Sequence, residues 1–188
     1  MKVTAKLLIG KEYVDKACSF TVNKEVHPNR YKLYKSEHSP IRCVTFWIEL
    51  FDVPTFCSTH FVRHSIGMTH FVKSNREDRA GHIEDKGRLT PVNHSLLLNA
   101  QALINMSRRR LCMKAHKETR LIMEAIKNAI SEIDPDLANC MLPDCQYRGA
   151  CHELTSCGDM PKFFQMIDMD DKENIERLIK LGWTPPQK

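Results

Sequence analysis

The longest regular pattern in this sequence runs from His94 to Ile133, where apolar side chains recur with roughly helical spacing. Asn93 or Ser95 is a suitable N-terminal cap for a helix, and Pro135 would end it. We therefore predict one long helix here, or two helices in line. Its apolar stripe consists of Leu96, Leu103, Met106, Leu111, Met113, Leu121, Ala125 and Ile126.

Two polar residues, Asn99 and Arg110, interrupt this stripe eleven residues apart. A continuous helix has about 3.6 residues per turn, so it would place both side chains on one face, roughly 16 Å apart. Hydrogen-bonding groups on a half-buried face need partners. Either a bound ligand or a buried polar network would supply them.

A second segment has the residue types of a phosphate or nucleotide site. An apolar strand over residues 44–51 runs up to Pro54, and a helix-like segment then leads into residues 59–65, which carry arginine, histidine and hydroxyl side chains. Arginine forks match phosphate oxygens, and hydroxyl and backbone N–H groups complete such a cradle. The alternative interpretation is a solvated basic turn.

The second segment resembles the signature of flavin-dependent thymidylate synthases. Arg63 and His64, with Ser74 and Arg76 further on, are similar to a family pattern that reads Arg-His-Arg and later Ser-x-Arg. The sequence departs from that pattern at Ser65, where the family has arginine.

The predicted long helix resembles a second segment of the same family. Residues 99–105, followed by Arg110 and by residues 115–118, are similar to a family pattern that reads Asn-Ala-Arg-x-Leu-x-Asn, then Arg, then Ala-Gln-x-Glu. Upstream, residues 37–40 resemble the family's His-Glu-Ser-Pro segment. The resemblance covers roughly residues 35–130.

The resemblance implies transfer of a one-carbon unit from methylenetetrahydrofolate to C5 of dUMP, or of a related pyrimidine deoxynucleotide, giving dTMP. It implies FAD as cofactor, NADPH as the reductant, and a homotetramer whose active sites are shared between subunits. It makes Arg110 the catalytic residue, which stabilises charge on the pyrimidine. It also implies substrate binding by His60, Arg63, Ser74, Arg76 and Arg110, and cofactor binding by His64, Ser65, Asn99 and Asn105.

Two other functions stay open. The same flavin chemistry could end in hydroxymethylation of dUMP, with water quenching the methylene adduct. Alternatively, the chain is a non-catalytic nucleotide-binding or interaction protein of the same fold, for which Ser65 is an argument because a hydroxyl cannot replace a guanidinium.

Composition favours a compact, cytoplasmic enzyme of one main domain. The chain has 188 residues, a net charge of +5 and 42% hydrophobic residues, values that suit a globular protein with an anionic ligand. We expect no membrane association, because no apolar run approaches the length of a span. We also expect no nucleic acid partner, which usually requires a denser basic face.

Four cysteines are concentrated near the C-terminal end of the sequence. Cys140, Cys145, Cys151 and Cys157 can satisfy a tetrahedral Zn²⁺, although a tight Cys-x-x-Cys pair is missing. Free thiols and disulfides are the alternatives. The other cysteines are expected to be buried small hydrophobic residues: Cys18, Cys43, Cys57 and Cys112.

The predicted fold class is α/β, more accurately α+β, with a central and mostly antiparallel sheet packed with long helices. We expect a catalytic domain over residues 1–135, a Cys-rich segment over 136–160, and a C-terminal helix and tail over 161–188. The expected strands cover residues 3–9, 17–22 and 43–51, and the expected helices cover residues 55–64, 94–133 and 171–181.

Overall fold

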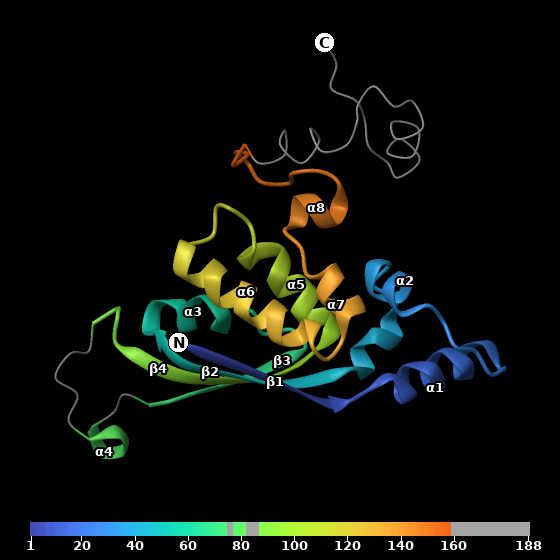
Figure 1. The fold of residues 1–188 in the computed structure, drawn as a ribbon, viewed down its shortest axis with the longest axis horizontal. Helices are drawn as coiled ribbons and strands as arrows, with labels where there is room; N and C mark the ends of the chain where they lie inside the picture. Colours follow the sequence, from blue (N-terminus) through green and yellow to red (C-terminus); the bar gives the residue numbers. More distant parts are fainter. Residues whose placement is uncertain (75–76, 82–86, 159–188) are drawn as a thin grey trace, which may run out of the picture.

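The computed structural model describes residues 1–74, 77–81 and 87–158. In these residues, most of the helices lie over one face of a single β-sheet (Figure 1). The elements are β1 (Lys2–Ile9), α1 (Lys11–Val22), α2 (Arg30–Lys35), η1 (Ser39–Cys43), β2 (Thr45–Pro54), α3 (Thr55–Val62), β3 (Met68–Val72), α4 (Glu77–Ala80), β4 (Pro91–Asn99), α5 (Ala100–Arg110), α6 (Lys117–Ser131), α7 (Pro135–Cys140) and α8 (Asp144–Arg148).

The sheet has the strand order β1-β2-β4-β3, and every neighbouring pair is antiparallel. Side chains alternate across it with the period of two that a strand imposes. Phe46 and Ile48 of β2 pair with Leu98 and Leu96 of β4, and all four are buried. The α+β class with an antiparallel sheet under helices is therefore confirmed.

The long helix predicted over residues 94–133 is wrong in its first part. Residues up to Asn99 form β4, which is paired with β2 on one side and β3 on the other. Leu96 fits a helical and an alternating pattern equally well, and the partner strands decide between them. The helix begins only after Asn99, whose Oδ1 accepts a hydrogen bond from the Ala102 N–H at 2.9 Å.

The rest of that segment is two helices separated by a turn. α5 ends at Arg110, residues 111–116 form the turn, and α6 begins at Lys117. We predicted that Pro135 would end the helix. Instead, α6 ends at Ser131, and Pro135 opens α7 at its first position. Asp134 caps this helix by accepting from the Leu137 N–H at 3.1 Å.

The strand predicted over residues 17–22 is also wrong, because this stretch belongs to α1. Val14 and Cys18, one helical turn apart, are its buried residues. The strands expected at 3–9 and 43–51 are confirmed as β1 and β2, and the helix expected at 55–64 is confirmed as α3. The helix predicted at 171–181 lies outside the described residues, and the domain boundaries stay a prediction.

Two tyrosines attach the C-terminal helices to α2. The Tyr34 hydroxyl donates to Asp134 Oδ2 at 2.6 Å, ahead of α7. The Tyr147 hydroxyl of α8 donates to the Tyr34 carbonyl oxygen at 2.8 Å. Across the described ranges, no helix combines the length and apolar content that crossing a membrane requires.

Candidate functional site

The segment from His60 to Gly67 runs along α5 and contacts both of its ends. Arg110, the last residue of α5, donates from its terminal nitrogen to the His60 carbonyl oxygen at 2.6 Å and from Nε to His64 Nε2 at 3.0 Å. At the other end, the Asn99 N–H donates to the Gly67 carbonyl oxygen at 3.0 Å. Asn99 and Arg110 therefore both face this turn, although Asn99 caps α5 and does not share a face of one continuous helix with Arg110.

Gly67 allows the turn to approach α5 this closely. Its φ of +74° lies in the left-handed region that glycine adopts at little cost. A Cβ at this position would lie 2.8 Å from Asn99 Nδ2. A side chain here would therefore displace the cap of α5.

Arg110 and the surrounding arginines determine the charge of the site. Burial, and then the positive charge of Arg110, lowers the pKa of His64 to about 4, so this imidazole is neutral near pH 7. Because His64 Nε2 accepts from Arg110, the proton of the neutral ring is on Nδ1. Burial, with Arg63 and Arg109 nearby, also lowers the pKa of Arg110. The turn thus combines a neutral histidine donor with several positive charges, which suits an anionic ligand.

Two histidines support the turn from the side of the sheet. His70 Nε2 donates to the His64 carbonyl oxygen at 2.5 Å, and its Nδ1 lies 3.0 Å from His94 Nε2. His94 Nδ1 in turn lies 3.1 Å from Ser58 Oγ. A carbonyl oxygen can only accept, so neutral rings give one consistent direction: Ser58 donates to His94, His94 to His70, and His70 to the turn.

Two cavities open beside the turn and adjoin at Ile66 and Asn105, which line both. The smaller has a volume of about 190 Å³ and the larger about 460 Å³. The second volume is in the range of ligand sites. The smaller is lined by Arg63, His64, Ser65, Ile66, Met68, Ala102 and Asn105, and the larger by Glu37, Arg42, Ile66, Gly67, Asn99, Gln101 and Asn105.

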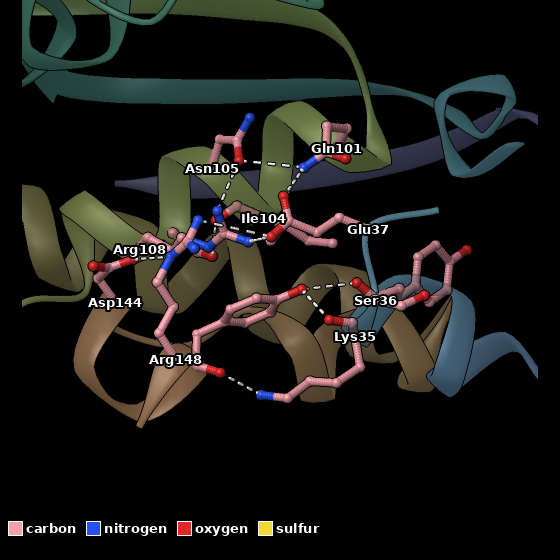
Figure 2. A network of polar contacts seen from close by, with 12 residues as sticks. Lys35, Ser36, Glu37, Gln101, Ile104, Asn105, Arg108, Asp144 and Arg148 are labelled. Atoms are coloured by element: carbon pink, nitrogen blue, oxygen red, sulfur yellow. Dashed lines mark hydrogen bonds and ion pairs between the residues drawn. The ribbon is translucent and has the colours of Figure 1, made fainter. Parts of the chain in front are cut away.

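A polar network fixes Asn105 between these cavities (Figure 2). Its Oδ1 accepts from Gln101 Nε2 at 3.3 Å and from Arg108 at 3.2 Å. Gln101 donates to Glu37 at 2.6 Å, and Arg108 forms an ion pair with the same carboxylate. The Arg108 guanidinium also lies 4.1 Å from the centre of the Tyr147 ring. The network therefore orients Asn105 and connects α5 to α8.

The structure brings most of the predicted site residues together. Arg63, His64 and Ser65 line the smaller cavity, and Asn99 the larger. His60 contacts Arg110 through its carbonyl oxygen, while its ring Nδ1 lies 2.8 Å from Thr119 Oγ1. These assignments as substrate or cofactor residues stay predictions.

The strand β3 separates Ser74 from the turn. Ser74 follows β3, which begins beside the turn at Met68 and ends at Val72, and the Lys73 N–H donates to the Asn93 carbonyl oxygen beyond that end. The strand alone separates its two ends by roughly 13 Å at about 3.3 Å per residue. Arg76 lies outside the described residues.

Several residues of the site were missed in the sequence. Arg108 was missed because it belongs to a run of three arginines, which is typical of the basic C-terminal end of a helix. His94 was assigned to a helix, although its alternation with Leu96 and Leu98 is a strand signal. Gly67, which follows an arginine- and histidine-rich turn, was the strongest available indication of a close backbone approach.

The four predicted metal ligands do not lie together. Cys145, Cys151 and Cys157 line one small cavity with Cys112, whereas Cys140 is fully buried in α7. All the cysteines are free thiols. In the parts of the chain that the structure describes, no three His, Cys, Asp or Glu side chains are already arranged to hold a metal ion.

Comparison with known proteins shows a shared fold. No protein-family model matches the chain, and no curated protein matches it in sequence. Thymidylate synthase X from Helicobacter pylori, solved with FAD and dUMP, is 13% identical, with a TM-score of 0.61 over 75% of this chain and 99% of that one. The UMP/dUMP methylase PolB from Streptomyces cacaoi, bound with 5-Br dUMP, is 15% identical, with a TM-score of 0.56 over 74% of this chain and 94% of that one. At these identities, the similarity establishes the fold.

Proposed function

We propose that this chain is a divergent flavin-dependent thymidylate synthase, which transfers a one-carbon unit from methylenetetrahydrofolate to C5 of dUMP and releases dTMP. The observation that carries this proposal is the meeting of Arg110 with His64, at the turn that bears the resemblance to the family signature. Fold neighbours that act on dUMP or bind it support the substrate class. NADPH would be the reductant.

The cavities beside the turn fit a flavin dinucleotide. A cofactor site is a cleft of about 300–1,000 Å³ in which a small number of polar groups fix the orientation of the ligand. The two adjoining cavities provide this, with Gly67 leaving the backbone open and with Asn99, Asn105 and Arg42 on the walls. His64 and Ser65 line the smaller cavity and would contact the same cofactor. When bound, FAD would supply the redox chemistry and carry the one-carbon unit.

The chain's own residues would position the nucleotide and stabilise charge. Arg110 now donates to two acceptors, His60 and His64. In the complex its guanidinium would turn to a pyrimidine carbonyl oxygen, where it would stabilise the negative charge that develops as C5 becomes nucleophilic. Neutral His64 would keep its proton on Nδ1 and donate from there. Arg63, exposed at the rim of the smaller cavity, would bind the phosphate as a bidentate fork.

A homotetramer with shared active sites would explain two further features. Ser74 would bind the phosphate from another subunit, because β3 separates Ser74 from the turn in its own chain. The sheet face opposite the helices carries apolar side chains that suit burial between subunits. There Trp47 and Phe71 lie with ring centroids 5.5 Å apart, and half of Phe71 is exposed.

The test combines a spectrum with a variant. We expect the purified protein to show bound flavin by absorption and, with dUMP, methylenetetrahydrofolate and NADPH, to release dTMP identified by mass. Arg110→Ala should keep the flavin but lower kcat/KM by about 100-fold or more, the usual cost of losing one charge-stabilising donor. Arg120→Ala, which removes a partly exposed arginine of α6, is the matched control.

The possible results separate the alternatives. A hydroxymethylated nucleotide would replace the proposed product while keeping the flavin chemistry. A colourless protein that binds no added FAD would refute the proposal in favour of a non-catalytic protein. Turnover by Arg110→Ala at the wild-type rate would show that the site is assigned to the wrong residues.

A further inference from the structure

A cluster of four thiols joins the C-terminal segment to the turn between α5 and α6. Cys145 of α8 and the two later cysteines, Cys151 and Cys157, line a cavity of about 20 Å³. The fourth thiol of this cavity comes from Cys112, which lies more than thirty residues earlier in the turn after α5. The cluster thus brings together cysteines from parts of the chain that are distant in sequence.

Cys140, which the sequence grouped with Cys145, Cys151 and Cys157, does not line this cavity. It is fully buried in α7, and its sulfur lies 4.0 Å from the Tyr31 carbonyl oxygen. Burial raises the pKa of this thiol to about 11. It is therefore a packed, protonated thiol and not a ligand of the same group.

Two polar contacts hold the C-terminal segment against the turn that carries Cys112. Arg109 forms an ion pair with Glu153. Lys114 Nζ donates to the Thr155 carbonyl oxygen at 2.5 Å. These contacts flank Cys112 on both sides, so they bring the loop thiols to it independently of any metal.

The same segment has no apolar core of its own. Residues 149–158 contain no helix or strand, and their one large aliphatic side chain, Leu154, is fully exposed. Two surface contacts contribute little to stability, since exposed ion pairs are worth about 0–1 kcal/mol. Small segments of this kind usually need a staple, and a structural metal is a common one.

We propose that Cys112, Cys145, Cys151 and Cys157 are the ligands of one structural, tetrahedral metal ion of the Zn²⁺ class. Thiolates are the ligands that such ions prefer, and a closed Cys₄ set is typical of structural sites. This proposal does not depend on the proposed enzyme activity, because the cluster lies outside the two cavities beside the signature turn.

Metal binding would require the thiols to move together, since they are not arranged for an ion as they stand. Cys112 lies in the turn after α5, and Cys151 and Cys157 lie in the irregular segment after α8, where the backbone can adjust without breaking a helix or a strand. One Zn²⁺ would replace four thiol protons, leaving a group of net charge −2 and releasing four protons. Arg108 and Lys114, which line the same cavity, would balance that charge.

The test compares Cys112→Ser with Cys140→Ala in the full chain. After dialysis against a weak chelator, wild type and Cys140→Ala should each retain about one zinc per chain, whereas Cys112→Ser should retain almost none. With Co²⁺ in place of Zn²⁺, the wild type should show the ligand-field bands of a tetrahedral four-thiolate site. Metal retained by Cys112→Ser and lost by Cys140→Ala would restore the set expected from sequence and overturn this one.

A second measurement does not depend on any variant folding. Alkylation of the native protein, mapped by mass spectrometry, should spare the four proposed ligands, and a strong chelator should expose those four while buried Cys140 remains protected. Metal-free wild type, or disulfides among the four in protein purified without oxygen, would refute the proposal.

Discussion

Acid should destabilise this protein through the buried histidine of β4. His94 is 1% exposed; its Nδ1 accepts from Ser58 and its Nε2 donates to His70. Burial, and then the neighbouring His70, lowers the pKa of His94 from its ordinary 6.5 to about 4. A lowered pKa means that the folded state binds this proton less readily than the unfolded chain does. The contribution of neutral His94 is therefore fully present above about pH 6.5 and is lost as the pH falls towards 4.

The magnitude follows from the shift. At about 1.4 kcal/mol per pKa unit, a change from 6.5 to about 4 corresponds to roughly 3 kcal/mol of stability that disappears between pH 7 and pH 4. Solvent screens a charge on this ring little, because the ring is buried. A domain is stable by only about 5–15 kcal/mol in total, so the loss is readily measurable.

The assay is urea unfolding of wild type and His94→Gln at both pH values. Glutamine can still donate and accept hydrogen bonds but cannot titrate, so the variant should be less stable at pH 7 and lose about 3 kcal/mol less than wild type on acidification. His64, which titrates in both proteins, cancels in this difference. His38→Gln, which changes an exposed ring, is the control and should keep the wild-type pH dependence. If acidification lowers the unfolding free energy of wild type and His94→Gln equally, protonation of buried His94 is not the cause of the acid sensitivity.

Two other substitutions test the signature turn. Arg63→Lys should raise the KM for dUMP by about tenfold, roughly 1.4 kcal/mol, because a point charge cannot replace a bidentate fork; Arg120→Lys is the control, and an unchanged KM would count against a phosphate role. Gly67→Ala should lower the unfolding free energy by about 2 kcal/mol, through its positive φ and the displaced Asn99 cap. Gly149→Ala has a similar φ but open space around its Cβ; the two variants should differ by about 1 kcal/mol in thermal unfolding, and equal losses would show that the contact with Asn99 is unimportant.

Local patterns in the sequence were sufficient to predict an element whose side-chain alternation and end signals lie within its own segment. β2 alternates buried and partly buried side chains, and Pro54 ends it, so the strand and the following α3 could be predicted. The turn at Arg63 and His64 could be predicted as a ligand site from its residue types, with a solvated basic turn as the alternative, and this stays a prediction. Its closeness to Arg110 followed only from the family resemblance, since no local pattern connects residues so far apart.

Tertiary structure decided the rest. Leu96 belongs to a strand because β2 and β3 offer hydrogen bonds on both sides of β4, and a peptide segment alone contains neither partner. The thiol that joins Cys145 and the later cysteines is Cys112 and not the nearby Cys140. Helix α7 turns Cys140 into the core, while contacts between distant parts of the chain carry Cys112 to the cluster. Sequence spacing determines which residues are neighbours in a helix or strand, whereas packing between elements determines which side chains share a site.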